Sequence, residues 1–164
     1  MIKIKRICVV IGSRANYSSI KSLLLELKKD NFFQLQIVTG FSALIENYGK
    51  VSDLIEKDGF KIDGYVYAHL DGDHNTMMAK TTGLGIIELS SVFEKLKPDL
   101  VFTIGDRFET LATATSAAYM NIPLAHTMGG EVSGNLDESV RHAITKLAHI
   151  HFPATIKSKI NLIQ

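Results

Sequence analysis

Short, mostly apolar runs alternate along this chain with segments that have a helical pattern. Strands buried on both faces of a parallel sheet are apolar at nearly every position, whereas half-exposed strands alternate with polar residues. Six runs fit the buried pattern best and predict strands: 7–11, 35–39, 61–67, 100–104, 123–127 and 150–153.

The segments between these runs predict helices. In 16–29, the residues Ile20, Leu23, Leu24 and Leu27 recur at helical spacing and define one buried face. The other predicted helices are 42–57, a long one that ends near 96, 108–120, 137–147 and 156–164. The repeated order of strand and helix predicts an α/β fold, a Rossmann-like three-layer domain with a parallel sheet.

Length and composition are those of one soluble globular domain spanning 1–164. The chain has 46% apolar and 21% charged residues, and its net charge of +1 lacks the basic excess typical of nucleic-acid-binding proteins. The apolar run behind the basic start is only 7–11, too short for a signal peptide or a membrane span. The lone cysteine, Cys8, fits a small buried hydrophobe in a reducing compartment. We therefore expect a cytoplasmic protein with no nucleic-acid or membrane partner.

The turn after the first predicted strand is a candidate anion site. Ser13 can cap the following helix and leave its amides facing an anion, and Arg14 can offer a planar fork of donors to a phosphate. The alternative is a plain strand–helix turn with a solvated arginine. The turn has neither the GxGxxG spacing nor a Walker lysine, so dinucleotide and P-loop binding are not supported.

Two more strand ends carry glycine beside a carboxylate. Asp106 follows Gly105 and is a candidate base or hydrogen-bond acceptor, with helix capping as the structural alternative. Glu131 follows Gly129 and Gly130, which permit positive φ and close approach to a ligand. In a partly dry cleft the pKa of Glu131 would rise and suit acid/base work, whereas in an open loop Glu131 is only solvated.

The predicted helix 137–147 begins with two charged pairs at a spacing of four residues. Asp137 shares a helix face with Arg141, and Glu138 shares one with His142. Pairs of this kind are common on surfaces and contribute only a few tenths of a kcal/mol. Beside Asp106 and Glu131, however, the face with Asp137 and Arg141 becomes a candidate wall of a site.

The other histidines indicate no metal site. His69 and His74 lie in a polar loop with Asp71 and Asp73, but no ligand spacing is recognisable there. We expect this loop to be solvated or to gate a substrate. Three histidines in or beside predicted strands are expected to be hydrogen-bonded structural residues: His126, His149 and His151.

Together these motifs resemble the hydrolysing UDP-N-acetylglucosamine 2-epimerases of sialic acid biosynthesis, of the bacterial NeuC type and the epimerase half of the animal bifunctional enzyme. The resemblance covers nearly the whole chain. It implies the N-terminal half of a GT-B-type fold, with the active site in a cleft between two Rossmann-like domains. The motifs that carry it are Gly12-Ser13-Arg14-Ala15, Tyr48-Gly49, 105–109, 129–134 and 137–147.

The resemblance also implies a reaction. The family converts UDP-N-acetylglucosamine into N-acetylmannosamine and UDP by anti elimination of UDP, then syn addition of water, and needs no metal or nicotinamide cofactor. It implies that Asp106, Glu131 and Asp137 are the catalytic carboxylates; we expect the first two to handle protons and Asp137 to be a third candidate. The implied substrate-binding residues are Arg14, Arg107, Gly130, Arg141 and His142.

Two departures leave alternatives open. Many relatives carry an acidic residue in place of Asn16 and glycine in place of Ser18, so a UDP-2,4-diacetamido-trideoxyhexose used for legionaminic acid is a competing substrate. The family's second domain is absent from these 164 residues, so we expect this chain alone to be inactive and the complete protein to be a dimer or tetramer. A non-catalytic module for sugar-nucleotide binding or oligomerisation is the alternative from another class. A GT-B glycosyltransferase fragment is disfavoured by the motifs at 129–134 and 137–146.

Overall fold

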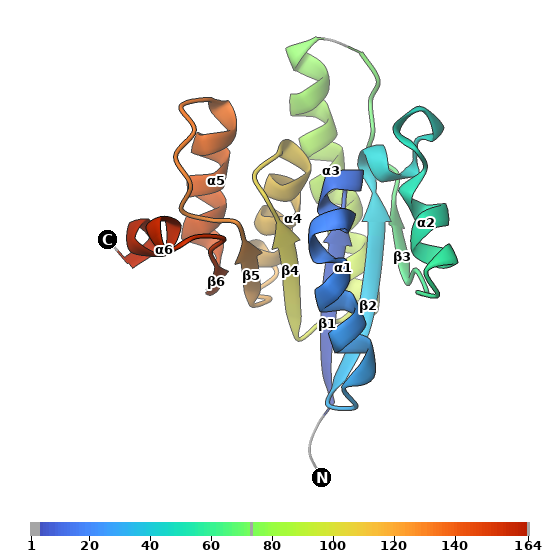
Figure 1. The fold of residues 1–164 in the computed structure, drawn as a ribbon. Helices are drawn as coiled ribbons and strands as arrows, with labels where there is room; N and C mark the ends of the chain where they lie inside the picture. The colour runs from blue at the N-terminus through green and yellow to red at the C-terminus, as the bar shows by residue number, and fades with distance from the viewer. Residues whose placement is uncertain (1–3, 73, 164) are drawn as a thin grey trace.

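The computed structural model describes residues 4–72 and 74–163, and within them the predicted parallel sheet is confirmed. Its strands run in the order β3-β2-β1-β4-β5-β6, and every neighbouring pair is parallel. In Figure 1, β3 and α2 lie at one end of the sheet and β6 and α6 at the other. The strands are β1 Lys5–Ile11, β2 Phe33–Gly40, β3 Gly64–Val66, β4 Leu100–Ile104, β5 Leu124–Thr127 and β6 Ile150–Phe152.

Helices cover both faces of the sheet, which gives the three predicted layers. Alternate residues of β1 face opposite ways: Val9 packs in the cluster that contains the buried face of α1, and Val10 packs with buried residues of α3 and α4. The α1 and α3 ribbons accordingly lie on opposite sides of the sheet (Figure 1). The helices are α1 Arg14–Lys29, α2 Val51–Lys57, α3 Asn75–Leu96, α4 Phe108–Tyr119, α5 Leu136–Leu147 and α6 Ile156–Ile163.

The predicted helix 42–57 is wrong in its first half. Two short 3-10 helices, Phe41–Leu44 and Glu46–Tyr48, precede α2. The backbone turns left-handed at Gly49 (φ 84°) and Lys50 (φ 35°), and a regular helix cannot continue through that conformation. Just before this break, the ring of Tyr48 contacts that of His69, which follows β3 (centroids 5.9 Å apart).

The predicted strand 61–67 is shorter than expected. The carboxylate of Asp63 accepts a hydrogen bond from the backbone N–H of Ile37 (3.0 Å), where a strand carbonyl would otherwise accept it. The pairing with β2 therefore begins at Gly64, opposite Val38. Cys8 is fully buried, as predicted, and burial raises the pKa of its thiol.

The strand order reverses direction between β1 and β4, since the chain moves outward to β2 and β3 before returning to β4. In open α/β sheets, ligands bind at the carboxyl ends of the strands beside such a switch point. None of the helices in the described ranges is long and apolar enough to cross a membrane.

Candidate active site

Asn16 joins the carboxyl ends of β1 and β4 at the switch point. Its Oδ1 accepts from the N–H of Gly12 (3.1 Å), and its Nδ2 donates to the carbonyl of Ile104 (3.1 Å). The predicted cap at Ser13 is confirmed, because its hydroxyl accepts from the N–H of Asn16 (3.3 Å). Arg14, the first residue of α1, is exposed at this edge of the sheet. The amide and the cap fix the backbone from which Arg14 projects.

Asp106 and Arg141 meet in an ion pair beside this switch point. Asp106 follows Gly105, whose φ of 81° turns the chain sharply at the end of β4. The Nε of Arg141 donates to Oδ2 of Asp106 (2.9 Å), and its second guanidinium nitrogen also contacts that oxygen. The side chain of Asp106 is 25% exposed, whereas that of Arg141 is 6% exposed. The Asp106 carboxylate is therefore accessible from the surface, while the guanidinium that holds it is buried.

The same arginine holds the loop after β5. Its Nη1 donates to the backbone carbonyl of Glu131 (2.7 Å), and the hydroxyl of Ser133 lies within 3.4 Å of the guanidinium. The loop leaves β5 through left-handed backbone at Met128 (φ 64°) and Gly130 (φ 82°). Arg141 thus connects the ends of two neighbouring strands to α5.

For these residues one expected pair is corrected, and one structural alternative is ruled out. Arg141 pairs with Asp106 from β4, not with Asp137 along its own helix, because its side chain turns inward over the strand ends. Asp106 does not cap α4: the cap position belongs to Arg107, and its side chain makes no capping hydrogen bond. Asp137 is half-buried in the first turn of α5.

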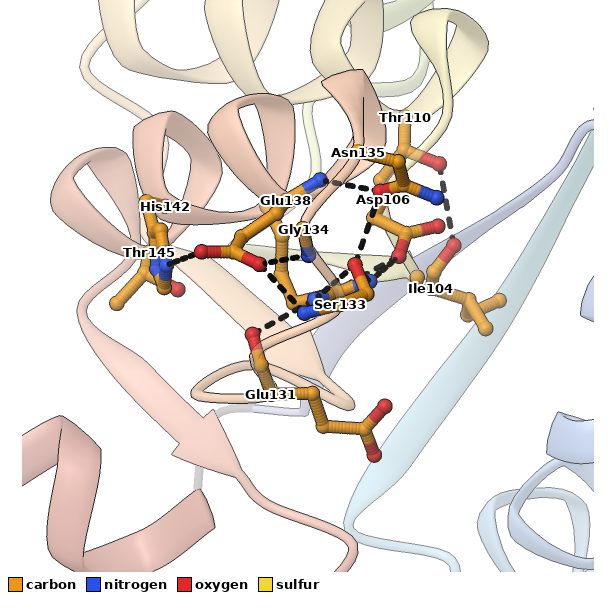
Figure 2. Close-up of polar contacts among 12 residues, drawn as sticks. Ile104, Asp106, Thr110, Glu131, Ser133, Gly134, Asn135, Glu138, His142 and Thr145 are labelled. Atoms are coloured by element: carbon orange, nitrogen blue, oxygen red, sulfur yellow. Dashed lines mark hydrogen bonds and ion pairs between the residues drawn. The ribbon is translucent and has the colours of Figure 1, made fainter.

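The carboxylate of Glu131 lies apart from that of Asp106. Figure 2 shows the Glu131 side chain directed away from Asp106, on the other side of its loop. It lines a hollow of about 230 Å³ together with residues at the start of α6, including Lys157 and Ser158. The structure therefore brings the backbone of Glu131 to Arg141 and leaves its carboxylate outside the Asp106 pair.

Glu138 and His142 form the other predicted helix pair, 3.6 Å apart. Glu138 accepts from the backbone N–H groups of Ser133 and Gly134, and these hydrogen bonds lower the pKa of its carboxyl. In Figure 2, His142 lies on the far side of Glu138 from Asp106. The pair supports the loop and does not reach the Asp106 carboxylate.

Gly130 and Arg107 occupy contrasting environments. Gly130 is buried against α6, where an added Cβ would lie 2.3 Å from the carbonyl oxygen of Ser158. Arg107 is more than half exposed at the start of α4, with its Nε 3.7 Å from Oε1 of Glu109. Arg107 is available to a ligand, and Gly130 shapes the loop.

Glu109 is a further candidate for the site, and the motif analysis gave it no role. It is 3% exposed, and its Oε2 has no hydrogen-bond partner among the described residues. Burial raises the pKa of its carboxyl and outweighs the lowering by the guanidinium of Arg107, while the carboxylates of Asp137 and Asp106 add smaller increases. A signal existed in the sequence: Glu109 shares a helical face with the small buried residues Ala112 and Thr113.

The structural role predicted for two histidines is confirmed. The Nε2 of His126 donates to the carbonyl of Gly105 (2.8 Å), and burial lowers the pKa of this ring. The Nδ1 of His149 accepts from the N–H of Leu124 (3.3 Å). The Nδ1 of His151 is buried and lacks a partner in the part of the chain that the structure describes.

In its described residues, the polar loop between β3 and α3 shows no metal-ligand geometry. Across 4–72 and 74–163, no group of three or more His, Cys, Asp or Glu side chains lies close enough to hold a metal ion. His74 instead caps α3, accepting from the N–H of Thr76 (3.3 Å). Asp73, which the sequence analysis placed in this loop, lies outside the described residues.

Curated relatives match nearly the whole of this chain. The chain is 40% identical over 161 residues to a UDP-N,N'-diacetylbacillosamine 2-epimerase (hydrolyzing) of Legionella pneumophila, covering 98% of this chain and 43% of that protein. It is 36% identical to a GDP/UDP-N,N'-diacetylbacillosamine 2-epimerase (hydrolyzing) of Campylobacter jejuni, covering 98% and 42%. The chain thus spans less than half the length of these relatives.

Solved structures and a family model agree with this match. A UDP-N-acetylglucosamine 2-epimerase superposes with a TM-score of 0.86 over 98% of this chain and 45% of its own, at 24% identity. The Neisseria meningitidis UDP-GlcNAc 2-epimerase bound to UDP-GlcNAc gives 0.82 over 96% and 43%, at 25% identity. The fold is therefore that of the N-terminal half of GT-B-type epimerases. Since the family model described as UDP-N-acetylglucosamine 2-epimerase matches residues 25–164, the chain belongs to that family.

Proposed function

We propose that the complete protein is a hydrolysing 2-epimerase of a UDP-2-acetamido sugar, of the NeuC type. The observation that carries the proposal is the Asp106 carboxylate, presented on the buried guanidinium of Arg141 at the switch point of the sheet. A carboxylate fixed in this way is a positioned proton acceptor. The two hydrolysing relatives described above support the reaction type.

The proposed reaction removes UDP and then adds water. A base takes the proton from C2 of the sugar, the C–H electron pair forms a C1–C2 double bond, and UDP leaves C1 with the electron pair of the C–O bond. Water then adds syn across this double bond, with its hydroxyl at C1 and its proton at C2. The proton reaches C2 on the face opposite the one that lost the first proton, which inverts C2. The balance is one UDP-sugar and one water giving UDP and the 2-epimeric sugar, with no change in oxidation state.

Each step needs charged groups of this chain in particular positions. We assign proton transfer at C2 to Asp106, with Glu131 and Asp137 as the candidates for the second proton-handling group. Asp137 is half-buried near Glu109, whereas the Glu131 side chain points away from Asp106 in Figure 2 and must turn to take part. Arg14 and Arg107 are exposed at the same edge and suit the departing diphosphate.

Two substrates remain in the proposal. UDP-N-acetylglucosamine would give N-acetylmannosamine, and a UDP-2,4-diacetamido-trideoxyhexose would give the corresponding diacetamido sugar. The identity to the two diacetylbacillosamine enzymes, 40% and 36%, exceeds the 29% to a Neisseria meningitidis UDP-N-acetylglucosamine 2-epimerase. This difference favours the diacetamido substrate.

The test uses the complete protein in heavy-isotope water. With each UDP-sugar, we expect UDP release and a 2-epimeric sugar that carries solvent deuterium at C2 and solvent ¹⁸O at C1, resolved by NMR and mass spectrometry. Oxygen-18 in UDP instead of the sugar would indicate hydrolysis at phosphorus and contradict the elimination. Binding without turnover of either substrate would favour a non-catalytic module.

Substitution of the carboxylates tests their roles. Asp106→Asn should lower kcat by about 10²–10⁴-fold, the usual contribution of a positioned acid or base. Glu131→Gln and Asp137→Asn should separate the two remaining candidates, since the variant that lacks the second proton carrier should show the same large loss. Near-normal turnover of Glu131→Gln would remove Glu131 from the mechanism.

A further inference from the structure

A small hollow lies at the carboxyl ends of β2 and β3, outside the charged cluster. It has a volume of about 130 Å³. Its floor is apolar and consists of three residues that are at most 1% exposed: Phe41, Val66 and Ala68. Leu44, Ile45, Tyr67 and His69 complete the lining. The proposed reaction assigns no part of the substrate to this hollow.

His69 gives the hollow its only ring nitrogens among the lining residues. Both nitrogens are shielded from solvent, and neither has a hydrogen-bond partner among the residues that the structure describes. A neutral imidazole carries one donor and one acceptor, and leaving both unmade costs free energy. The rings of His69 and Tyr48 make a T-shaped contact, with centroids 5.9 Å apart. The donor and the acceptor of this ring are therefore unused beside the apolar walls of the hollow.

The hollow adjoins the candidate active site on two sides. Phe41 also packs beside Gly12, Asn16 and Glu109 at the switch point. Next to Tyr48, a Cβ on Gly49 would lie 3.2 Å from a guanidinium nitrogen of Arg14. β2 and β4 are two strand spacings apart, about 10 Å. A hexose whose C2 lies at Asp106 can direct a ring substituent toward the hollow over that span.

We propose that this hollow is a specificity subsite for the second acetamido group of a 2,4-diacetamido sugar nucleotide. An acetamido group has an N–H donor and a carbonyl acceptor, which point in opposite directions, and a methyl group. One of the two polar groups can pair with a nitrogen of His69 while the methyl group meets the apolar walls. A 4-hydroxyl supplies a donor and an acceptor but no methyl, so it leaves the floor formed by Phe41 and Val66 unfilled. The inference rests on the proposed function, because it concerns which UDP-sugar that reaction accepts.

The experiment compares kcat/KM of the complete protein for UDP-2,4-diacetamido-2,4,6-trideoxyglucose and for UDP-N-acetylglucosamine. We expect the wild-type protein to prefer the diacetamido substrate. His69→Phe keeps a ring against Tyr48 but removes both nitrogens, and should lower kcat/KM for that substrate by about 10–200-fold. The value for UDP-N-acetylglucosamine should stay unchanged. Ala68→Val fills the hollow without touching His69 and should shift selectivity in the same direction.

His74→Asn is the matched control, because it changes an exposed histidine of the same loop and keeps a side chain that caps α3. It should leave both kcat/KM values unchanged. An equal loss for both substrates in folded His69→Phe and Ala68→Val would overturn the subsite, as would a wild-type preference for UDP-N-acetylglucosamine. Wild-type turnover of neither substrate would instead overturn the proposed function itself.

Discussion

Arg141 directs its guanidinium to protein atoms on two strand-end loops, so it positions groups that a substrate would meet. Sequence spacing predicted that Arg141 and Asp137 share a helix face, and it placed Asp106 in the same site. It did not predict the pair between Arg141 and Asp106, which are 35 positions apart. Local spacing rules describe neighbours on one helix, whereas this contact depends on how α5 packs against β4 and β5.

Removal of this side chain should affect folding as well as activity. Arg141→Ala leaves the Asp106 carboxylate and the Glu131 carbonyl without their partner, and loss of one member of a buried pair costs about 3–5 kcal/mol. Urea unfolding should show a loss at the lower end of this range, since Asp106 is partly exposed. Lys146→Ala, at an exposed position on the same helix, is the control. Wild-type stability with reduced affinity for substrate would contradict the positioning role and favour direct contact.

Glu109 makes a pH-dependent contribution to stability. Because its pKa is raised in the folded state, folding favours its protonated form, and the free energy of unfolding falls as pH rises from the ordinary glutamate pKa through the raised one. Glu109→Gln should remove this fall. Compared with the wild-type protein, the variant should therefore gain stability at neutral pH relative to acid pH. Urea titrations between about pH 4 and pH 8 measure it. Parallel pH profiles of wild type and variant would show that Glu109 titrates normally.

At the scale of elements, the loop before α5 is held from the helix side. The side chain of Asn135 caps α5 by accepting from the N–H of Glu138 (3.2 Å), and Glu138 in turn accepts from two loop amides. The capping pattern is visible in the sequence once the start of the helix is known. The 3-10 turns at 41–48 were not predictable in the same way, because their apolar residues also fit one continuous helix.

The cap at Asn135 provides an element-scale prediction. Asn135→Ala should destabilise the protein by about 1 kcal/mol, and Asn135→Asp, which keeps a capping oxygen, should not. Amide hydrogen exchange of the loop 131–135 should accelerate in the alanine variant. Unchanged exchange there would mean that the loop depends on Arg141 and not on the cap.

At the scale of the whole molecule, the two edges of the sheet carry different kinds of residues. The candidate residues gather at the carboxyl edge, while Arg6 and Asp99 pair at the opposite edge, where Asp99 accepts from the backbone N–H of Arg6 (2.8 Å) and from its Nε (3.2 Å). The alternation of strands and helices predicted this polarity, since parallel strands send all their carboxyl ends to one side. A second domain, an oligomer and a cytoplasmic location remain predictions for the complete protein.

This separation predicts that stability and activity can be changed independently. Asp99→Ala removes charged hydrogen bonds to Arg6 and should lower the free energy of unfolding by about 1.5–3 kcal/mol. It should leave kcat/KM of the complete protein unchanged at temperatures where the variant is folded. A large loss of kcat/KM in a folded Asp99→Ala protein would show that the two edges are coupled.

The close approach of Gly12 and Glu109 constrains how this protein can evolve. A Cβ at position 12 would lie 2.7 Å from the Cγ of Glu109, so any side chain there collides with the glutamate stem. A shorter residue at position 109 would remove this collision. Substitutions at the two positions should therefore show epistasis with a fixed order, in which Glu109 is shortened before Gly12 is replaced. Replacement of Gly12 first should give a poorly folded intermediate.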